Sequence, residues 1–411
     1  MRYLSKFHPI PITQSKAYFH SKSSKLNTLL KEALKSKSTT KTLQLFQSIQ
    51  NKRASSVDSF SLNFVLKACT MRSSQLEGKQ IHALIINLGF NSVIFLQTTL
   101  INLYSVSGNL QDAHQVFDEI STRNVICWTA LISAYADNGR ANEALKLFKV
   151  MQMENFEPDQ VTVTVALSAC ASVGSLEIGE KIHEYVQGKQ AFEADLCLNN
   201  SLINMYVKCG DLSSARKVFD KLTQRDVTTW TSMIVGYALH GEADESLRLF
   251  AEMSRNCAIL PNEITFIGVI MACSHAGMVD EGWQHFKSMR KKYNVRPKIS
   301  HYGCMVDLLC RAGQLKEAYT FILNMPIQPN AVIWRTLLGA CSHQGSTELG
   351  KMARERLIEL EPTYVGDDVA MSNTFAYAGM WEEKMTVRDS AKHRRRPGCS
   401  SIELKKMNIR P

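Results

Sequence analysis

Several features that would assign this 411-residue chain to a common protein class are missing from it. No apolar run approaches the about 18 residues that a membrane-spanning helix needs, so we expect no membrane segment. The eleven cysteines include no C-x-x-C pair, and four of them recur at one packing position, which implies a reduced compartment rather than a disulfide scaffold. The first 22 residues hold no acidic side chain, and the first in the chain is Glu32.

Catalytic motifs are also missing. A zinc-dependent cytidine deaminase needs H-x-E together with a downstream P-C-x-x-C to hold the metal and move the proton, and this combination does not occur. The phosphate-binding G-x-x-x-x-G-K-[ST] loop and the G-x-S-x-G elbow are absent too. We therefore expect a chain that is not an enzyme, without catalytic residues, metal site, cofactor or small-molecule substrate.

The net charge of +10 lies mainly at the two ends of the sequence. Residues 1–22 carry four Lys or Arg, and residues 392–411 carry seven against the single acid Glu403. The residues between them are close to neutral. If the central part binds nucleic acid, base contacts and surface shape must matter as much as bulk charge.

The stretch from Val125 to Gln160 shows the organisation of the whole chain. Apolar residues recur at helical spacing on both sides of Gly139, which predicts two amphipathic helices joined by a left-handed turn. Pro158 is expected to end the second helix, because proline cannot donate to the helical hydrogen-bond ladder. One hairpin cannot bury both apolar stripes alone, so neighbouring hairpins are needed.

The sequence supplies those neighbours. A shift of 102 positions aligns LISAYADNGRANEALKLF with MIVGYALHGEADESLRLF. Glycines expected at the turns follow one another at intervals of 31 to 36 residues, at Gly108, Gly139, Gly174, Gly210, Gly241, Gly277, Gly313, Gly345 and Gly379. Three hairpin types of about 36, 36 and 31 residues alternate, which predicts an all-α, right-handed α-solenoid superhelix.

Four cysteines recur at one place of one repeat type, in LKAC, LSAC, IMAC and LGAC. They are Cys69, Cys170, Cys273 and Cys341. A small apolar thiol at a fixed place in a helix is typical of core packing, so we interpret them as packing residues rather than metal ligands.

The repeat pattern resembles that of plant pentatricopeptide repeat proteins of the PLS subfamily, which alternate long, short and standard repeats, with an E extension. The strings LISAYADNG, EALKLFKVM, LINMYVKCGDLSSARKVFD and YGCMVDLLCRAGQLKEAY carry the resemblance over residues 23–403. Tetratricopeptide repeats share single elements of these strings but not the threefold alternation. The resemblance implies an organellar single-stranded RNA-binding protein that positions a cytidine for conversion to uridine by a deaminase-bearing partner.

On this basis the chain divides into five segments. Residues 1–22 resemble an organellar transit peptide, for a mitochondrion or alternatively a chloroplast, with a disordered basic tail as the other interpretation. Residues 23–331 form about nine repeats in three triplets, the first having Lys37 in place of the turn glycine. Residues 332–365 form a first E motif, 366–403 a second, shortened one with Ser401 where the family usually has tryptophan, and 404–411 a basic tail.

Base recognition is predicted from a polar residue near the start of each first helix and the last residue of the same repeat. Five such pairs occur: Asn27 with Asp58, Thr98 with Asn124, Thr129 with Asp159, Asn200 with Asp226, and Thr231 with Asn262. For any single pair the alternative is structural, with Thr or Asn as a helix N-cap and Asp or Asn as a turn residue. Five pairs in register favour binding. Val165 and similar residues occupy the matching place in the long repeats, and Gly303 does so in the last short one.

The chemistry of the second member sorts the bases. A carboxylate only accepts, so Asp suits U and G, which carry a ring N–H, while the Asn amide can donate to the bare ring nitrogen of A or C. The family pattern adds that Asn in the first helix implies a pyrimidine and Thr a purine. Together these assign U to Asn27 and Asp58, A to Thr98 and Asn124, G to Thr129 and Asp159, U to Asn200 and Asp226, and A to Thr231 and Asn262.

Two further functions stay open. The chain is either an RNA processing or stabilising factor without editing, or a helical-repeat scaffold that binds proteins. A peptide-binding array would more often show a Lys or Arg clamp or an apolar groove than these polar pairs.

Overall fold

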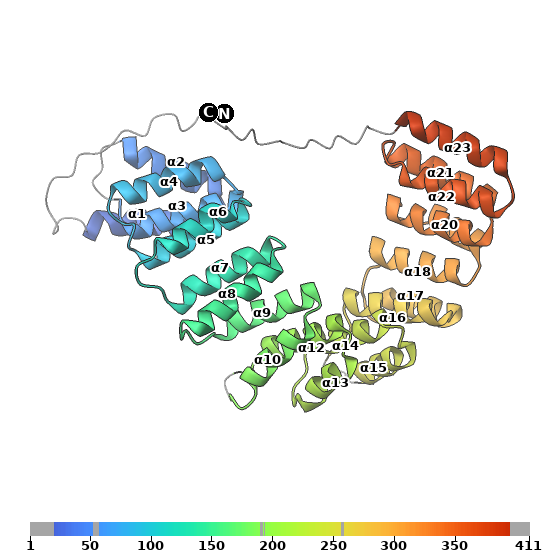
Figure 1. Ribbon diagram of the computed structural model, residues 1–411, viewed down its shortest axis with the longest axis horizontal. Helices are drawn as coiled ribbons and strands as arrows, with labels where there is room; N and C mark the ends of the chain where they lie inside the picture. The colour runs from blue at the N-terminus through green and yellow to red at the C-terminus, as the bar shows by residue number, and fades with distance from the viewer. Residues whose placement is uncertain (1–19, 52–56, 190–191, 193, 256–258, 395–411) are drawn as a thin grey trace, which may run out of the picture. The chain divides into compact units, whose positions relative to one another are not determined.

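The computed structural model describes residues 20–394 except 52–56, 190–191, 193 and 256–258. The described residues form 22 helices and no strand, which confirms the all-α class (Figure 1). Backbone contacts divide the chain into two compact units, residues 1–218 and 219–411, and each is described by itself. Among the described residues no helix has the length and apolar character needed to cross a bilayer.

The first unit contains α1 His20–Lys35, α2 Thr39–Asn51, α3 Ser59–Arg72, α4 Gln75–Asn87, α5 Ile94–Val106, α6 Leu110–Asp118, α7 Val125–Asp137, α8 Ala141–Met153, α9 Gln160–Val173, α10 Leu176–Val186, α12 Leu196–Cys209 and α13 Leu212–Lys221. The last of these helices, α13, extends three residues past the end of the unit. Those of the second unit are α14 Val227–Leu239, α15 Ala243–Arg255, α16 Glu263–Ala276, α17 Val279–Lys291, α18 Ile299–Arg311, α19 Leu315–Leu323, α20 Ala331–Gln344, α21 Thr347–Leu360, α22 Gly366–Tyr377 and α23 Trp381–Arg394.

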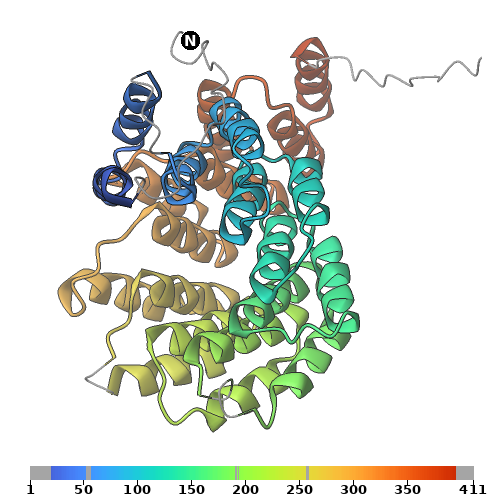
Figure 2. The ribbon, with the colours of Figure 1, turned by 90° about the vertical axis from the view of Figure 1, so that its left-hand side faces the viewer.

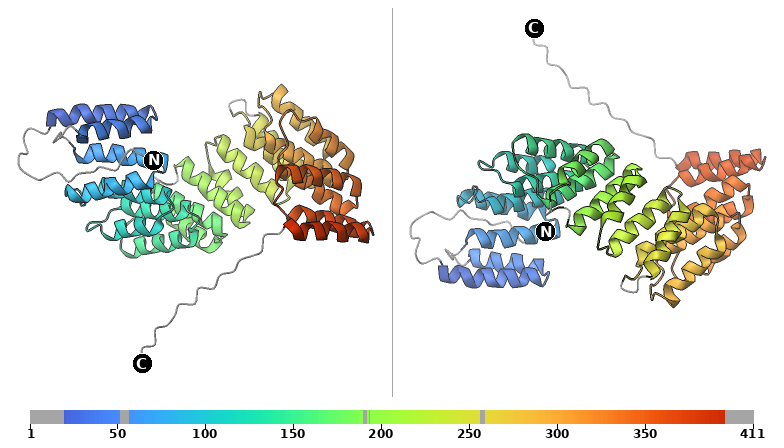
Figure 3. Two further views of the ribbon diagram at one scale, coloured as in Figure 1. Left: turned by 90° about the horizontal axis from the view of Figure 1, so that it is seen from above. Right: turned by 90° about the horizontal axis from the view of Figure 1, so that it is seen from below.

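Within each unit the helices stack as hairpins. The first helix of a hairpin packs on its own second helix and on the first helix of the next hairpin, as α5 does on α6 and α7 and α16 does on α17 and α18. Figure 2 shows this stacking for the blue to green helices of the first unit, and Figure 3 for the yellow to red helices of the second. The predicted stack of two-helix repeats is confirmed.

The turns explain the glycine spacing. All nine predicted turn glycines have positive φ, for example 74° at Gly139, where other residues are strained. Lys37, which stands in place of a glycine, adopts the same left-handed conformation with φ of 55°. The first hairpin therefore keeps the common turn without the common residue.

A second set of glycines sets the distance between neighbouring hairpins. A Cβ added at Gly78 would lie 2.4 Å from Leu103 Cδ2, and one at Gly179 would lie 2.4 Å from Met205 Sδ. Each glycine is on a second helix, and the atom it meets is on the next first helix. The missing side chain thus lets the second helix approach its neighbour closely.

The repeated cysteines lie in the core. Cys69, Cys170, Cys273 and Cys341 are fully buried, as expected for packing residues. Burial raises the pKa of the Cys69 and Cys170 thiols to about 12 and of the other two to about 11. These groups therefore stay protonated at neutral pH.

Candidate nucleic-acid interface

The second member of each predicted pair caps a first helix. One side-chain oxygen accepts a hydrogen bond from the backbone N–H of the third residue of the helix that follows, which would otherwise lack a partner. The capping residues are Asp58 for α3, Asn124 for α7, Asp159 for α9, Asp226 for α14 and Asn262 for α16. The cap fixes where each of these side chains lies.

The first members of the pairs are not caps, so the structural alternative considered for them from the sequence is wrong. Thr98, Thr129, Asn200 and Thr231 are each the fifth residue of their helix. Asn27 lies further along, as the eighth residue of α1. Their side chains emerge from the second or third turn, where a helix needs no cap.

Three of the pairs that lie within one unit are joined by hydrogen bonds. The Asn27 amide donates directly to Asp58, with 2.9 Å between Nδ2 and Oδ2. The hydroxyl of Thr129 reaches Asp159 through Thr162. In the same way, the hydroxyl of Thr231 reaches Asn262 through Thr265. The Thr129 and Thr162 oxygens are 2.6 Å apart, and Thr162 Oγ1 is 2.6 Å from Asp159 Oδ1.

The corresponding contacts of the third pair are 2.7 Å between the Thr231 and Thr265 oxygens and 3.0 Å between Thr265 Oγ1 and Asn262 Oδ1. The bridging hydroxyls of Thr162 and Thr265 are fully buried. Water therefore has no access to replace them.

The pair of Thr98 and Asn124 differs. Within the described part of the chain no hydrogen bond joins Thr98 to Asn124, and the Thr98 hydroxyl donates to the Phe95 carbonyl at 3.0 Å. The third residue after Asn124 is Cys127, which has no hydroxyl to bridge with. The fifth pair, Asn200 and Asp226, falls in two different units, and both residues are half-buried.

Capping also decides which polar atom is left for a ligand. The cap requires an acceptor, so Asn124 and Asn262 direct Oδ1 toward the helix, at 3.0 and 2.9 Å from the backbone nitrogens they cap. Their amide nitrogens have no acceptor among the described residues and are left to donate. Asp159 uses Oδ1 in its cap, and the described residues provide no donor for its Oδ2. Asn124 and Asn262 thus offer a donor and Asp159 an acceptor.

Exposed apolar side chains line the same helix ends, a feature that the sequence analysis missed. The second residue of many first helices is exposed: Phe60 at 58%, Ile126 at 62%, Val161 at 59%, Ile264 at 56% and Val332 at 65%. Phe60 also stacks on Phe95 with 5.4 Å between ring centroids. This position is three residues before the polar reading position, so the two are neighbours on the helix surface. We call the capping, second and fifth positions together the reading face.

The bridging threonines were missed as well. Their signal in the sequence is the spacing of a capping Asp or Asn and a Ser or Thr three residues later, as in Asp159 with Thr162 and Asn262 with Thr265. The helix start also corrects the residue expected at the reading position of this long repeat. The fifth residue of α9 is Thr164, and Val165 lies one position later.

Two later hairpins have no Thr or Asn at the fifth position: one has a glycine there and the other an ion-paired arginine. At Gly303, the fifth residue of α18, the nearest atom an added Cβ would meet is 4.0 Å away, so the place is open. The fifth residue of α20 is Arg335, whose guanidinium is bound by Asp367 and Glu361 and lies 4.1 Å above the Tyr364 ring. That hairpin, in the predicted E extension, therefore has an ion pair where earlier hairpins have Thr or Asn.

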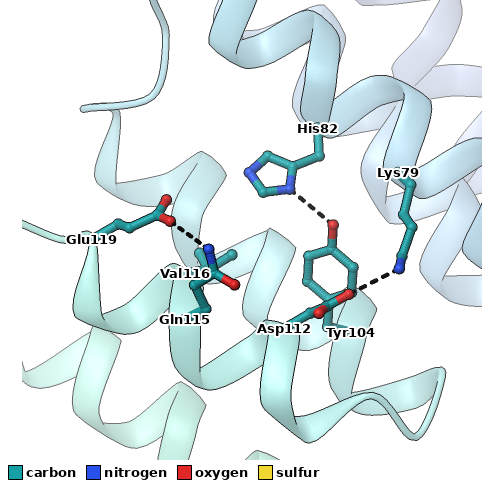
Figure 4. A pocket seen from close by; sticks show the side chains of 7 residues that line it. All are labelled: Lys79, His82, Tyr104, Asp112, Gln115, Val116 and Glu119. Carbon is teal, nitrogen blue, oxygen red and sulfur yellow. Dashed lines mark hydrogen bonds and ion pairs between the residues drawn. The ribbon is translucent and has the colours of Figure 1, made fainter. Parts of the chain in front are cut away.

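A polar pocket of about 270 Å³ lies between α4 and α6 (Figure 4). Its polar groups pair with one another: His82 Nδ1 is 2.8 Å from the Tyr104 hydroxyl, Lys79 is 3.0 Å from Asp112, and Gln115 donates to Glu119 at 3.0 Å. Burial lowers the pKa of His82. No reading residue lines this pocket.

The His82–Tyr104 contact recurs at later repeats, as His114 with Tyr135 at 3.0 Å and His183 with Tyr206 at 2.7 Å. We therefore interpret it as part of the packing between hairpins. In the described part of the chain no group of three or more His, Cys, Asp or Glu is placed to hold a metal ion.

Family models agree with this architecture. The pentatricopeptide repeat model matches residues 98–125, 200–227, 228–257, 264–293 and 300–326, and a second repeat model of that family matches 123–172. An E motif model matches residues 345–403.

Curated plant proteins match over most of the chain. One pentatricopeptide repeat-containing protein of Arabidopsis thaliana is 40% identical over 383 residues, covering 84% of this chain and 72% of its own length. A second, named as mitochondrial, is 39% identical over 332 residues, covering 80% and 71%. The chain spans only 49%, 65% and 54% of the length of three other such relatives.

Among solved structures, the chain is similar to the pentatricopeptide repeat protein PPR10, known from maize, in complex with an 18-nt psaJ RNA element. The TM-score is 0.76 at 18% identity, covering 92% of this chain and 56% of the other, a likeness that concerns the fold. Together with the repeat and E motif matches, the curated relatives show that this chain belongs to the pentatricopeptide repeat family, in the E subgroup of its PLS subfamily.

Proposed function

We propose that this chain is a non-catalytic adaptor that binds single-stranded RNA by sequence in a plant organelle. The observation that carries the proposal is the reading face, where a helix cap fixes a donor or an acceptor beside an exposed apolar side chain. Bases stack on apolar side chains, and their Watson–Crick edges meet fixed polar groups. PPR10, which shares the fold, is itself a protein in complex with RNA.

The order of the repeats gives a target. With one base per hairpin and the long repeats left unread, the five pairs specify U, x, A, G, x, U, A along the array, where x is any base. The capping geometry supports the choice between Asp and Asn, and the choice between purine and pyrimidine rests on the family pattern.

The finer proposal is that the bound RNA is edited from C to U by a deaminase recruited in trans. Membership of the E subgroup supports it, because the E extension is where such a partner is expected to dock. Ser401, the departure noted from the sequence, lies outside the described residues. An RNA processing or stabilising role without editing, and a protein scaffold, are the alternatives.

We infer an organellar location from the names of relatives. Two are named as mitochondrial and one as chloroplastic/mitochondrial. This chain is proposed to act in the mitochondrion, with the chloroplast as the alternative, and residues 1–22 are proposed as its transit peptide.

Fluorescence anisotropy with the full chain tests the RNA role. The probe is labelled RNA with the bases in the order U, x, A, G, x, U, A, made in both orientations and compared with a scrambled RNA of equal composition and with the matching DNA. One orientation should bind at least about tenfold more tightly than the scrambled RNA, since each correct base contact contributes about 1–3 kcal/mol. Equal affinity for target and scrambled RNA would reject sequence-specific binding. Sequencing organellar transcripts from plants lacking the protein then tests editing.

A further inference from the structure

The hydroxyl proton of each reading threonine is held by the protein, but by different acceptors. Thr98 donates to the Phe95 carbonyl, and Thr129 has both the Val125 carbonyl at 2.8 Å and Thr162 at 2.6 Å within reach. For Thr231, Thr265 is the only acceptor among the described residues. The orientation of the Thr231 hydroxyl therefore depends on one side chain.

The direction of the Thr231–Thr265 hydrogen bond follows from the neighbours of Thr265. Its oxygen accepts from the Asn262 backbone N–H at 3.1 Å, and its proton points to Asn262 Oδ1 at 3.0 Å. Either oxygen could donate in the 2.7 Å contact between the two threonines; since a hydroxyl has one proton and that of Thr265 is assigned to Asn262 Oδ1, we assign Thr231 as the donor. Toward the reading face, Thr231 is then left with lone pairs only.

This arrangement has a consequence for base choice, which rests on the proposed RNA-binding function. With Thr265 in place, Thr231 is an acceptor and the Asn262 amide nitrogen a donor, which complements the amino group and bare ring nitrogen of adenine. Without Thr265, the Thr231 proton is released and can donate to a carbonyl oxygen. Guanine presents such an oxygen, O6, where adenine has its amino group.

We propose that Thr265 is a positioning residue, which keeps Thr231 acceptor-only and so adds to the discrimination against guanine that Asn262 provides, without touching the RNA. The side chain of Thr265 is fully buried and that of Thr231 nearly so, at 6% exposure. The positioning bond is therefore formed inside the protein and not in solvent.

The chain offers a matched control. Thr162 occupies the same third position of its helix, is equally buried, and contacts both its cap and its reading threonine. Thr129, however, keeps a second acceptor in the Val125 carbonyl. The same substitution at the two sites thus removes the same hydroxyl but releases the reading proton at only one.

The test measures the affinity of the full chain for RNAs with A, G, C or U at the nucleotide assigned to Thr231 and Asn262. Thr265→Val should lower the preference for A over G about 2- to 10-fold, the worth of one net hydrogen bond. Thr265→Ser should restore it, and in a Thr231→Ala background Thr265→Val should change it no further. Thr162→Val should leave the preference at its own nucleotide within about twofold of wild type.

The outcomes separate the two proposals. If the wild-type chain shows no base preference at this nucleotide, the RNA-reading function fails, and the positioning role fails with it. If the wild type discriminates and Thr265→Val weakens all four RNAs equally or leaves the A-to-G ratio unchanged, only the positioning role is overturned. Unfolding midpoints of each variant show whether uniform weakening reflects lost stability.

Discussion

The guanidinium of Arg335 on α20 binds both carboxylate oxygens of Asp367 on α22, with Nε 2.8 Å from Oδ1 and Nη2 3.1 Å from Oδ2. Next to it Asp368 pairs with Arg354 of α21, Nη2 being 2.7 Å from Oδ1. Two consecutive buried carboxylates thus tie the start of one hairpin to both helices of the hairpin before it.

Asp367→Ala is expected to destabilise the helices α20 to α22. Asp367 is 5% exposed, so its loss leaves the partly buried Arg335 charge with the more exposed Glu361 as its remaining carboxylate partner. Breaking a buried pair costs about 3–5 kcal/mol, and the cost here should lie at or below the lower end because Arg335 is 29% exposed and keeps Glu361. Amide hydrogen exchange of α20 and α22 measures the local loss. Glu359→Ala, which breaks the exposed Arg356–Glu359 pair, should cost less than about 1 kcal/mol.

Thr129→Asn is expected to change the preferred base at one nucleotide from G toward U. Asp159 still requires a ring N–H, and an Asn in the first helix can bond a capping Asp directly, as Asn27 does with Asp58. Affinity for the G-containing RNA should fall by about 1–3 kcal/mol, measured by anisotropy with four RNAs that differ at this base. Equal weakening of all four would mean that Thr129 only packs. Thr320→Asn, on the exposed side of α19, is the control.

Phe60→Ala is expected to weaken RNA binding whatever the base, because stacking does not distinguish bases by their hydrogen-bonding edges. The loss should be about 1–2 kcal/mol, within the range for stacking on aromatic side chains. Stability should fall by less than about 1.5 kcal/mol, the worth of its stacking on Phe95. A change in base preference would contradict a stacking role. Leu323→Ala, which removes an apolar side chain exposed at 52% on α19, should leave affinity unaltered.

The double substitution Trp381→Ala and Met385→Ala is expected to reduce editing but not RNA affinity. These residues, exposed at 60% and 55%, are four apart on α23 and share one face in the E motif region. Complementation of plants lacking the protein, followed by transcript sequencing, measures editing. Full editing by the double variant would place recruitment elsewhere. Leu76→Ala, 77% exposed on α4, controls for loss of surface apolar area.

Stability is expected to fall as the pH drops below about 6.5. Burial holds the pKa of His82 below its ordinary 6.5, so in acid the unfolded chain takes up a proton that the folded chain does not. Stability from this group is present above pH 6.5 and is lost toward the lower pKa of the folded state. Urea unfolding at pH 7.5 and 5.5 measures the drop. His82→Gln, which does not titrate, should make it smaller, and an unchanged drop would assign it to other groups such as His285.

Much of the fold could be predicted because the same turn and core residues recur in successive repeats. Gly139 and its equivalents mark turns, and Cys69 and its equivalents mark the core, since both follow from local constraints on backbone or volume. The left-handed turn at Lys37 could not be seen, because no residue type there required it. The identification of Thr164 in place of Val165 needed the true helix start, which the sequence defines only within one or two residues.

The reading face was only half visible in the sequence. Residue types showed that Asp159 accepts and Asn262 can donate. They did not show that Oδ1 of each side chain is used in a helix cap, which leaves Oδ2 of Asp159 and the amide nitrogen of Asn262 for a ligand. The bridge from Thr231 to Thr265 joins residues 34 apart, and the pairing of Arg335 with Asp367 joins residues 32 apart. Such contacts depend on how hairpins stack, which a periodic pattern does not specify.

The distribution of cysteines has a practical consequence. The four core thiols are buried and their pKa values are raised, so they are poor nucleophiles toward maleimides at neutral pH. Cys197 is the exposed one among the described cysteines, and it is the second residue of α12, where other first helices carry the apolar side chains of the reading face. With Cys257 and Cys399 replaced by serine, a fluorophore attached at Cys197 would stand where a base is proposed to stack, and its emission would report the arrival of RNA in real time.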